Sequence, residues 1–575
     1  MAQENPIPNI LGVSGGGHDA AAALFKGGEL AAAVEEEKLV RARPMRGLPV
    51  EAIRYCLQAA GLKPEQIGYV ALARPLYEAP EDREAGESWI PKRLKREFPS
   101  SKVVVLDHHL CHAAAAYLAS PFDEAGVLTL DENGDMKTGS LSMARGTVLD
   151  PLEESYFPDS LGNLFSRVAR LAGFSASGDE HKLQWLSTWG QPVYAPVFRR
   201  IVGSKAGRDV GSEAAGGDSH RASDHGPLLN LDQSYFQAHR NDHGGFAEKF
   251  FHAAGLDPEQ PLTEEARADL AASIQQVVEE TVVDLCCRLA AQHGIRNLCL
   301  GGGVALNSLL VEKLETAGLF SGIFVQPAAG NAGNALGAAL YCAHSIAGLP
   351  RSFRLEHLYY GPQYSGSEIK EVLENCKLGF RYLRTRDEIV KAGVEVLERN
   401  RILGWFQGRV EFGPRALGSR SILASPFGPY VNENLNQYVK HREKFRPFAA
   451  SVIEERAGEF FEFGPMASFL ATVGRVKPSH RKTFASNLLA NRPAGDSSAP
   501  AESDRIRVHT VSRKTNPLFW ELLTAFGRTS GVPVLFNTSF NLFGEPLVCS
   551  PRDAVRSFYC SGIDELIIGN FLISK

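Results

Sequence analysis

KVVVLDHHLCHAAAAYLASPFDEAGVLTLDENGD (residues 102–135) contains two short apolar runs on either side of an alanine-rich segment. The first run, 103–106, is typical of a buried strand, and the alanine-rich segment predicts a helix that ends near Ser120 and Pro121. The second run, 126–130, predicts another strand. That strand delivers Asp131 to its C-terminal end, which is where open α/β sheets place their ligands.

His108 and His112 lie one turn apart and therefore share a face of the predicted helix. Two imidazoles and the Asp131 carboxylate suit a borderline divalent metal better than calcium or magnesium, which prefer oxygen ligands. The alternative is that His112 caps a core helix and Asp131 opens a turn. The HxxxH spacing together with the strand-end Asp favours the metal site. His109 and Cys111 point off this face and are predicted to be packing residues.

Composition limits the classes of protein to consider. At 575 residues the chain is too long for one core, so about three structural units are expected. A net charge of -5 argues against a nucleic-acid-binding surface. The nine cysteines include no C-x-x-C pair, which argues against a zinc ribbon or a disulfide framework and favours a reducing, cytoplasmic setting. No signal peptide or membrane-spanning segment is predicted, so we expect a soluble protein without a membrane partner.

A glycine turn near the N-terminus, ILGVSGGGHDAAAALF (10–25), predicts strand, turn and strand, followed by a strand at 30–35. The three glycines let the backbone approach a phosphate or carbonyl closely. His18, next to Asp19, is a candidate general base, although a turn histidine facing water is the simpler interpretation. The charged run 35–43 predicts a solvated helix start.

Two later segments repeat a strand, glycine turn and helix: NLCLGGGVALNS (297–308) and FVQPAAGNAGNALGAAL (324–340). The first leaves helix amides free for a phosphate or nucleotide, which makes Gly302, Gly303 and Asn307 candidate contacts. Together with the HxxxH site, these units resemble the two-lobed fold of sugar kinases, actin and Hsp70. Between them and the HxxxH site, GDEHKLQWLSTWG (178–190) suits a pocket wall or a surface loop, and 203–245 suits a long loop or lid.

A second unit is expected after a linker near residue 350. Its cations alternate with Gly, Pro and Phe rather than with Glu, which favours an anion site over a solvated cationic face. These cations are Arg409, Arg415, Arg420, Lys440, Arg442 and Arg446. The polar segment 479–504 is predicted to be a mobile surface excursion.

These motifs together resemble the O-carbamoyltransferases of the nodulation and antibiotic-tailoring family, in which a Kae1-like domain precedes a YrdC-like domain. The resemblance extends over nearly the whole chain and rests on HDAAAAL, HHLCHAA, GGVALN, GWFQGRVEFGPRALG, KHREKFRPFA and LFNTSFN, which occur in the family's order. It implies an α/β fold: a two-lobed actin/Hsp70/sugar-kinase-like (Kae1-like) domain at 1–349 and an α/β YrdC-like domain at 350–575.

The resemblance also implies a reaction in two steps. The YrdC-like domain would use ATP, with Mg, and carbamoyl phosphate to make carbamoyl adenylate. The Kae1-like domain would then transfer the carbamoyl group to a hydroxyl of a small-molecule acceptor, a natural product or a sugar-containing compound. We expect no nucleic-acid partner, and a homodimer is left open.

By the match, Lys440, Arg442, Ser539 and Asn541 would surround the nucleotide and carbamoyl group, with support from Arg415, Arg446 and Arg507. Arg507 precedes a VHT where the family has VQT. His108, His112 and Asp131 would hold a divalent metal, with iron the expected ion, and His18 would activate the acceptor hydroxyl.

Three departures from the family pattern bear on the site. The family's fourth metal ligand, an Asp, is here Asn331, which offers only a neutral carbonyl. The usual DGxGE is here DENGD, with Glu132 replacing a Gly. The position of GEYKVMGLAPYG holds GDEHKLQWLSTWG, which indicates a different acceptor pocket.

Three alternatives remain. A threonylcarbamoyl-type tRNA-modifying enzyme uses the same domain types, but the acidic net charge and the domain order disfavour it. A hydrogenase-maturation carbamoyltransferase should carry paired C-x-x-C zinc sites and should have the YrdC-like part first. Neither feature is present in this sequence. A non-catalytic nucleotide-binding protein of the actin-like fold would leave the cations of the second domain unexplained.

Overall fold

The computed structural model describes residues 7–15, 19–43, 47–74, 83–84, 87–176, 178–203, 228–237, 243–428, 431–485, 488–489 and 503–575. His18, most of the 203–245 segment and about half of the 479–504 segment lie outside these ranges. Among the helices within them, none is long and apolar enough to cross a bilayer.

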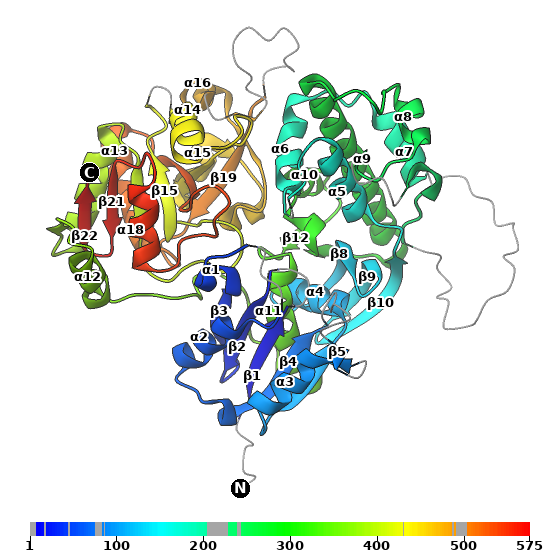
Figure 1. Ribbon diagram of the computed structural model, residues 1–575, viewed down its shortest axis with the longest axis horizontal. Coiled ribbons are helices and arrows are strands. Elements are labelled where there is room, and N and C mark those ends of the chain that lie inside the picture. Colours follow the sequence, from blue (N-terminus) through cyan, green and yellow to red (C-terminus); the bar gives the residue numbers. More distant parts are fainter. Residues whose placement is uncertain are drawn as a thin grey trace, which may run out of the picture.

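The first sheet has the strand order β3-β2-β1-β4-β7 and lies at the bottom of Figure 1. β1 and β2 are apolar over nearly their whole length because both faces of the sheet are covered. On one face, Leu11 and Leu24 pack with Ile53 of α2 (Val50–Ala60) and Leu94 of α3 (Trp89–Glu97). The strands are β1 (Asn9–Ser14), β2 (Ala21–Lys26), β3 (Glu29–Glu35), β4 (Ile67–Ala73) and β7 (Lys102–Leu106).

The second sheet repeats this plan with the order β10-β9-β8-β11-β12. In both sheets the first three strands are antiparallel neighbours and the last two run parallel to the first. Its strands are β8 (Glu124–Gly134), β9 (Lys137–Arg145), β10 (Val148–Tyr156), β11 (Asn297–Gly301) and β12 (Gly322–Val325). This duplicated order confirms the predicted two-lobed, actin-like fold of the N-terminal part.

Two helices, α4 (His108–Tyr117) and α11 (Asn331–Tyr341), lie between the two sheets and pack against each other. Small residues permit this contact: a Cβ on Gly337 of α11 would lie 1.9 Å from the Cys111 carbonyl oxygen of α4. A group of helices lies on the far side of the second sheet, at the upper right of Figure 1. They are α5 (Leu161–Leu171), α6 (Glu180–Leu186), α7 (Ala195–Val202), α8 (Glu248–Ala254), α9 (Glu264–His293) and α10 (Ser308–Thr316).

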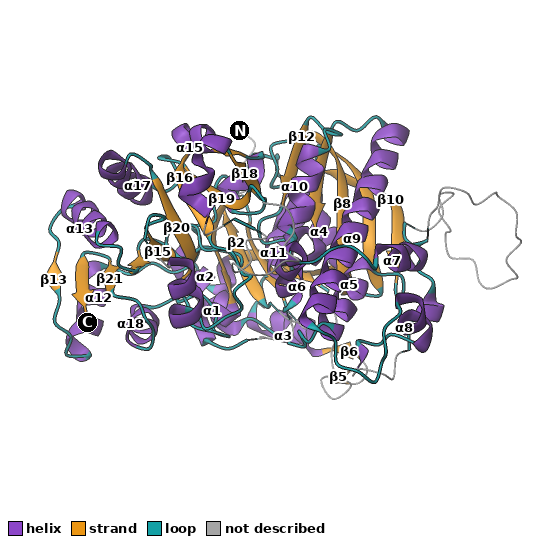
Figure 2. Cartoon of the chain, turned by 90° about the horizontal axis from the view of Figure 1, so that it is seen from above, coloured by secondary structure: helices purple, strands orange, loops and turns teal. Residues whose placement is uncertain are grey.

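The C-terminal part is built on a ten-stranded sheet that lies at the upper left of Figure 1 and the left of Figure 2. One core joins this sheet to α12 (Gly366–Asn375) and α18 (Pro551–Tyr559), and another joins it to α13 (Arg386–Glu398) and α17 (Pro517–Ser530). In sheet order the strands are β13 (Arg381–Tyr382), β22 (Phe571–Ser574), β21 (Glu565–Ile568), β14 (Leu403–Phe406), β15 (Arg420–Ala424), β20 (Val534–Ser539), β16 (Ala449–Ile453), β19 (Arg505–Val511), β18 (Gly474–Val476) and β17 (Phe461–Glu462).

The charged run after β3 corrects one prediction, because it forms a buried helix, α1 (Glu36–Val40), rather than a solvated one. Lys38 is 1% exposed, and its Nζ donates to Glu35 Oε1 at 2.9 Å and to the carbonyls of Glu411 and Gly413 at 2.6 and 2.8 Å. Gly413 N donates to Glu35 Oε1 at 2.6 Å. The charges therefore join the first lobe to the C-terminal part, a use that the local sequence does not reveal.

Candidate functional site

Two imidazoles of α4 and one carboxylate of β8 form the first half of the site. Asp107 begins the helix, because its side chain accepts a hydrogen bond from Leu110 N at 3.0 Å. His108 and His112 then lie one turn apart on the buried face, as predicted. β8 continues to Gly134, so Asp131 does not end the strand, contrary to expectation. The parallel pairing of β8 with β11 does stop at Thr129, and this frees Asp131 to face the helix.

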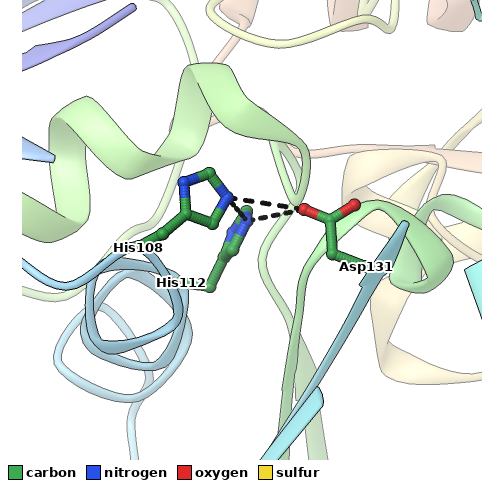
Figure 3. Close-up of side chains that lie close together, drawn as sticks. All are labelled: His108, His112 and Asp131. Carbon is green, nitrogen blue, oxygen red and sulfur yellow. Dashed lines mark hydrogen bonds and ion pairs between the residues drawn. The ribbon is translucent and has the colours of Figure 1, made fainter. Parts of the chain in front are cut away.

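Both imidazoles turn toward the carboxylate, as Figure 3 shows. His112 Nε2 lies 3.1 Å from His108 Nε2 and 3.0 Å from Asp131 Oδ2, and His108 Nε2 lies 3.6 Å from the same oxygen. One potential ligand atom from each of the three residues lies within 4.8 Å of the other two, so together they could hold a metal ion. His109 and Cys111 are buried packing residues, as predicted, and His109 bonds to Thr129 Oγ1 at 2.8 Å.

The protonation states of His112 and Asp131 are suited to binding a cation. Burial is the main cause that lowers the pKa of His112, so this imidazole is neutral at physiological pH. Burial alone would raise the pKa of Asp131, but the hydrogen bonds from His108 and His112 hold it well below its usual range. A neutral imidazole and an ionised carboxylate are the forms that bind a metal.

Two glycines leave room for these side chains. A Cβ on Gly134 would lie 2.2 Å from His108 Cδ2, and a Cβ on Gly303 would lie 2.9 Å from Asp131 Oδ1. The second contact places the predicted nucleotide turn directly beside the Asp131 carboxylate. Gly302 has a φ of 84° and also lies against β8, because a Cβ there would be 2.2 Å from the Leu130 carbonyl oxygen.

Asn307 has a structural use that the sequence did not reveal. Its Oδ1 accepts from Leu310 N at 3.1 Å and so caps α10, and its Nδ2 donates to Gln275 Oε1 at 2.8 Å. The arrangement therefore does not support Asn307 as a nucleotide contact. For Gly302 and Gly303, a contact with the nucleotide stays a prediction.

Two asparagines of α11 bear on the candidate metal site, because Asn331 was predicted to be one of its ligands. Asn331 is the first residue of the helix and is buried. Asn334, one turn further, is the side chain that contacts the imidazoles: its Nδ2 lies 3.3 Å from His108 Nε2 and 3.3 Å from His112 Nε2. Sequence reasoning missed Asn334, although its i, i+3 spacing from Asn331 places both on one face of α11.

The second half of the site is a buried cation in the C-terminal part. Lys440 follows the π-helix Asn434–Val439, and its Nζ donates to the Ser539 carbonyl at 2.8 Å and to Asn541 Oδ1 at 2.5 Å. Ser539 ends β20, and its hydroxyl donates to Asn541 Oδ1 at 2.7 Å. The predicted K-x-R and S-x-N elements are thus adjacent in space through Lys440.

Arg442 and Arg446 lie in the loop between Lys440 and β16. Asn436 fixes Arg442 by accepting a hydrogen bond from its Nε at 2.7 Å, a role that the sequence did not indicate. Burial, and after it the charges of Arg442 and Arg446, lower the pKa of Lys440 well below its usual range. Several cations thus share one poorly hydrated space.

Arg507 of β19 and Arg415 complete this cluster. Burial, and then the charges of Arg415, Arg442 and Arg446, lower the pKa of Arg507 well below its usual range. Its Nε and Nη2 are buried without a hydrogen-bond partner among the described residues. Burial, and then Arg446, lower the pKa of Arg415 to about 10. Because a guanidinium keeps its proton at neutral pH, an anion is the group that would relieve this arrangement.

Arg409 and Arg420 do not join the cluster, contrary to prediction. Arg409 donates to the carbonyls of Gly361, Ala31 and Tyr360. Arg420 is fully buried, stacks on Phe406 at 3.6 Å and donates to the carbonyls of Gln407 and Ser419. Both arginines therefore fix the backbone around β14 and β15. Their sequence context resembles that of the anion-site cations, so charge alone could not separate them.

The segment 178–190, predicted to be a pocket wall or a surface loop, faces the cation cluster. Trp185 of α6 lies under the Arg507 guanidinium at 5.3 Å. Lys182 pairs with Asp179 at 2.9 Å and with Glu443, next to Arg442, at 3.5 Å. The N-terminal part therefore covers one side of the cation cluster.

Arg415 connects the two halves of the site. Its Nη2 donates to the Leu306 carbonyl at 3.2 Å, at the end of the short helix Gly303–Leu306. Gly303, at the start of that helix, lies against Asp131. One four-residue turn thus connects the cation cluster to Asp131, one of the candidate metal ligands.

Comparison with known proteins agrees with this arrangement. Residues 9–90 and 84–340 match the family described as Carbamoyltransferase N-terminus, and residues 394–575 match Carbamoyltransferase C-terminus. An uncharacterized protein of Synechocystis sp. is 34% identical over 99% of this chain and 97% of its own. The nodulation protein NolNO of Sinorhizobium fredii is 33% identical over 97% of this chain and 79% of its own.

Among solved structures, component A of (R)-2-hydroxyglutaryl-CoA dehydratase from Acidaminococcus fermentans is similar to this chain. It covers 59% of this chain and 99% of its own, at 16% identity and a TM-score of 0.34. The fold assignment therefore rests on the repeated strand order, and the family assignment rests on the sequence matches. On those matches, which extend over both parts of the site, the chain belongs to the carbamoyltransferase family.

Proposed function

We propose that the protein is an ATP-dependent O-carbamoyltransferase that makes carbamoyl adenylate in its C-terminal part and transfers the carbamoyl group in its N-terminal part. The observation that carries this proposal is Arg507, whose buried Nε and Nη2 lack a partner among the described residues. Its neighbours are three further arginines. A buried donor group without an acceptor costs free energy, so the site is suited to an anion with several oxygens.

Carbamoyl phosphate and the triphosphate of ATP, accompanied by Mg, are the anions that the family reaction provides. Lys440, held by Ser539 and Asn541, would act as a point charge beside the carbamoyl group. Arg442, Arg415, Arg446 and Arg507 would bind phosphate oxygens. Trp185 would cover the site and exclude water.

The reaction balances with one water. Carbamoyl phosphate loses its phosphoryl group to water, which leaves carbamate and phosphate. A carbamate oxygen then attacks the α-phosphorus of ATP, the bond to the β-phosphate oxygen breaks, and pyrophosphate leaves. The cations stabilise the negative charge that gathers on the leaving phosphates, which is where such groups contribute most to the rate.

The residues of the N-terminal site fit a divalent transition metal, with iron the expected ion. The donor set is two imidazoles and one carboxylate, and Gly134 and Gly303 supply the room for it. Asn331 remains a predicted ligand, because it occupies the position of the family's aspartate. A bound metal would act as a Lewis acid toward the adenylate phosphate. His108, His112 and Asp131 would hold it there.

Transfer also requires removal of a proton from the acceptor hydroxyl. We assign this role to His18, which lies outside the described residues, on the basis of its place in the HDAAAAL motif. A positioned base contributes roughly 100-fold to 10,000-fold to such a step. The acceptor would be a small hydroxylated molecule, a natural product or a sugar-containing compound.

The alternative of a tRNA-modifying enzyme is disfavoured by the net charge of -5, since nucleic-acid binding depends on basic surface. A gel-shift experiment with tRNA would test it. All nine cysteines, which the described residues include, are unpaired, in keeping with a reducing, cytoplasmic setting. The proposed reaction needs no second copy of the chain, although a homodimer is compatible with it.

The test of this proposal is pyrophosphate release by the purified protein with ATP, Mg and carbamoyl phosphate. Release should depend on carbamoyl phosphate, and Lys440→Ala should reduce it by about 100-fold or more, because a buried charge at the reacting group is lost. Arg456→Ala is the matched control, since Arg456 lies on the surface helix α15 (Glu454–Phe460) and pairs with Glu459. Release without carbamoyl phosphate, or unaffected by Lys440→Ala, would show that this part has another function.

A further inference from the structure

The helix α6 presents one face to the cation cluster, and that face carries a histidine that the proposed reaction does not use. His181 and Trp185 are four positions apart, so they lie on the same face of this helix. Trp185 lies under the Arg507 guanidinium at 5.3 Å. In Figure 1, α6 lies on the side of its helix group that faces β19. His181 therefore faces the same cluster as Trp185.

Aromatic contacts hold this helix against the loop between Lys440 and β16, which carries two arginines of the cluster. Phe445 of that loop packs edge-on against Phe174 at 6.2 Å and against Trp189 at 5.9 Å. These two residues lie on either side of α6 along the chain. Phe445 also packs against the small apolar core to which Trp185 belongs. The place of α6 beside the loop is thus fixed by packing before and after the helix.

One ring nitrogen of His181 bonds to the backbone, and the other is left for a ligand. Nδ1 lies 2.6 Å from the carbonyl oxygen of Gly178, which can only accept a hydrogen bond, so Nδ1 carries the proton. Within the described part of the chain, this is the hydrogen bond that the ring makes, and the side chain is only partly buried. Nε2 of the neutral ring is therefore an accessible acceptor.

The neighbouring charges keep this ring neutral. Burial, and after it the charge of Arg446, lower the pKa of His181 well below its usual range, and the charge of Arg415 adds to the effect. An imidazole that does not hold a proton is a poor general base, so His18 keeps that proposed role. The guanidinium and ammonium groups of the cluster can only donate hydrogen bonds, and His181 adds an acceptor beside them.

We infer that His181 Nε2 accepts a hydrogen bond from the substrate in the cation cluster and so selects a substrate that carries a donor beside its phosphate groups. This inference rests on the proposed function. The substrates of that reaction carry uncharged donors in two places. One is the ribose of ATP, with its two hydroxyls, and the other is the amino group of carbamoyl phosphate.

Pyrophosphate release in the absence of an acceptor tests this inference, because no acceptor hydroxyl is then present to donate. ATP would be compared with 2′-deoxy-ATP and 3′-deoxy-ATP as substrates. Acetyl phosphate, which has a methyl group in place of the amino group, would be titrated as a competitor, and its inhibition constant compared with the KM of carbamoyl phosphate. In one of these comparisons, wild type should favour the compound with the donor by about 3- to 30-fold, as expected for one hydrogen bond.

Three variants complete the experiment. His181→Leu should lose the preference of wild type, because it has a similar bulk but no acceptor. His181→Gln, which keeps an acceptor oxygen, should retain part of it. His252→Leu is the matched control, since His252 is an exposed histidine of α8, and it should discriminate like wild type.

The comparison that loses its preference identifies the donor as a ribose hydroxyl or as the carbamoyl amino group. If His181→Leu discriminates like wild type in every comparison, or if wild type discriminates in none, the role of His181 is overturned while the proposed function stands. Absence of carbamoyl-phosphate-dependent release from wild type would instead contradict the proposed function itself. Thermal unfolding would show that each variant is folded, and His181→Phe, which keeps a flat ring, gives the same test if His181→Leu is not.

Discussion

His509 is a buried imidazole next to the cation cluster, and we expect it to make the folded state sensitive to acid. It is 2% exposed, and its Nδ1 lies 2.9 Å from Ser451 Oγ. Burial, and then the charge of Arg507, lower its pKa from 6.5 to about 3. The residue stands where the family motif has glutamine, in VHT rather than VQT.

We predict that His509→Gln removes part of the loss of stability between pH 7 and pH 5. Above pH 6.5 the imidazole is neutral in both states. As the pH falls toward 3, the unfolded chain takes up a proton that the folded protein excludes, so the free energy of unfolding decreases. For one such group the loss is about 2 kcal/mol at pH 5. Urea unfolding of both proteins at the two pH values measures it, and an equal loss in both would contradict the assignment.

At the residue level, the sequence identifies those side chains whose spacing along the chain is enough to place them close together in the fold. His108 and His112 share a helical face at any helix position, and Asp131 follows an apolar run, so these three could be predicted. Asn334 was missed although it shares a helix face with Asn331, because its partners come from a different helix across a packed interface. The prediction that Arg409 and Arg420 bind an anion was wrong for a related reason. Whether an arginine donates to backbone carbonyls or to a ligand depends on the tertiary fold.

At the element level, α1 joins the first lobe to the C-terminal part through charges. Lys38 contacts Glu35 and two carbonyls of the 411–413 segment. The neighbouring Arg41 donates to the carbonyls of Leu547 and Pro546. Glu411, in turn, accepts hydrogen bonds from Leu417 N and Ser419 N through its Oε1. This arrangement orders the loop that carries Arg415.

We predict that Lys38→Ala destabilises the protein by about 3–5 kcal/mol, because it leaves Glu35 buried without its cation. Chemical unfolding would measure the change. Lys370→Ala is the control, since Lys370 forms an exposed i, i+4 pair with Glu374, and it should stay within about 0.5 kcal/mol. A Lys38→Ala protein as stable as the control would show that the buried charges of α1 do not hold the two parts together.

The strands and helices of the two lobes could largely be predicted, since each apolar run between glycine turns became a strand. The error at 35–43 has a physical cause. A charged segment such as EEEKLVRAR (35–43) is readily solvated by itself, and only the approach of residues 411–413, more than 370 positions away, gives it partners to bury against. Local pattern carries no information about such a contact.

At the scale of the whole molecule, one apolar core is shared by the two lobes and the C-terminal part. Residues of the C-terminal part, among them Phe412, Met466 and Phe469, belong to the same apolar core as the two lobes. Glu312 of α10 adds ion pairs to Arg475 and Arg505 at 3.3 and 3.1 Å. This attachment fixes the position of the cation cluster relative to His108, His112 and Asp131, as the proposed passage of a labile intermediate between the two sites would require.

The central claim is that two sites divide the reaction, and pyrophosphate release without any acceptor tests it most directly. The rate would be measured with ATP, Mg and carbamoyl phosphate for wild type, Lys440→Ala, and the double variant His108→Ala with His112→Ala. The double variant should release pyrophosphate at nearly the wild-type rate, because its cation cluster is intact, whereas Lys440→Ala should not. If the folded double variant loses release as completely as Lys440→Ala, the two sites do not divide the reaction.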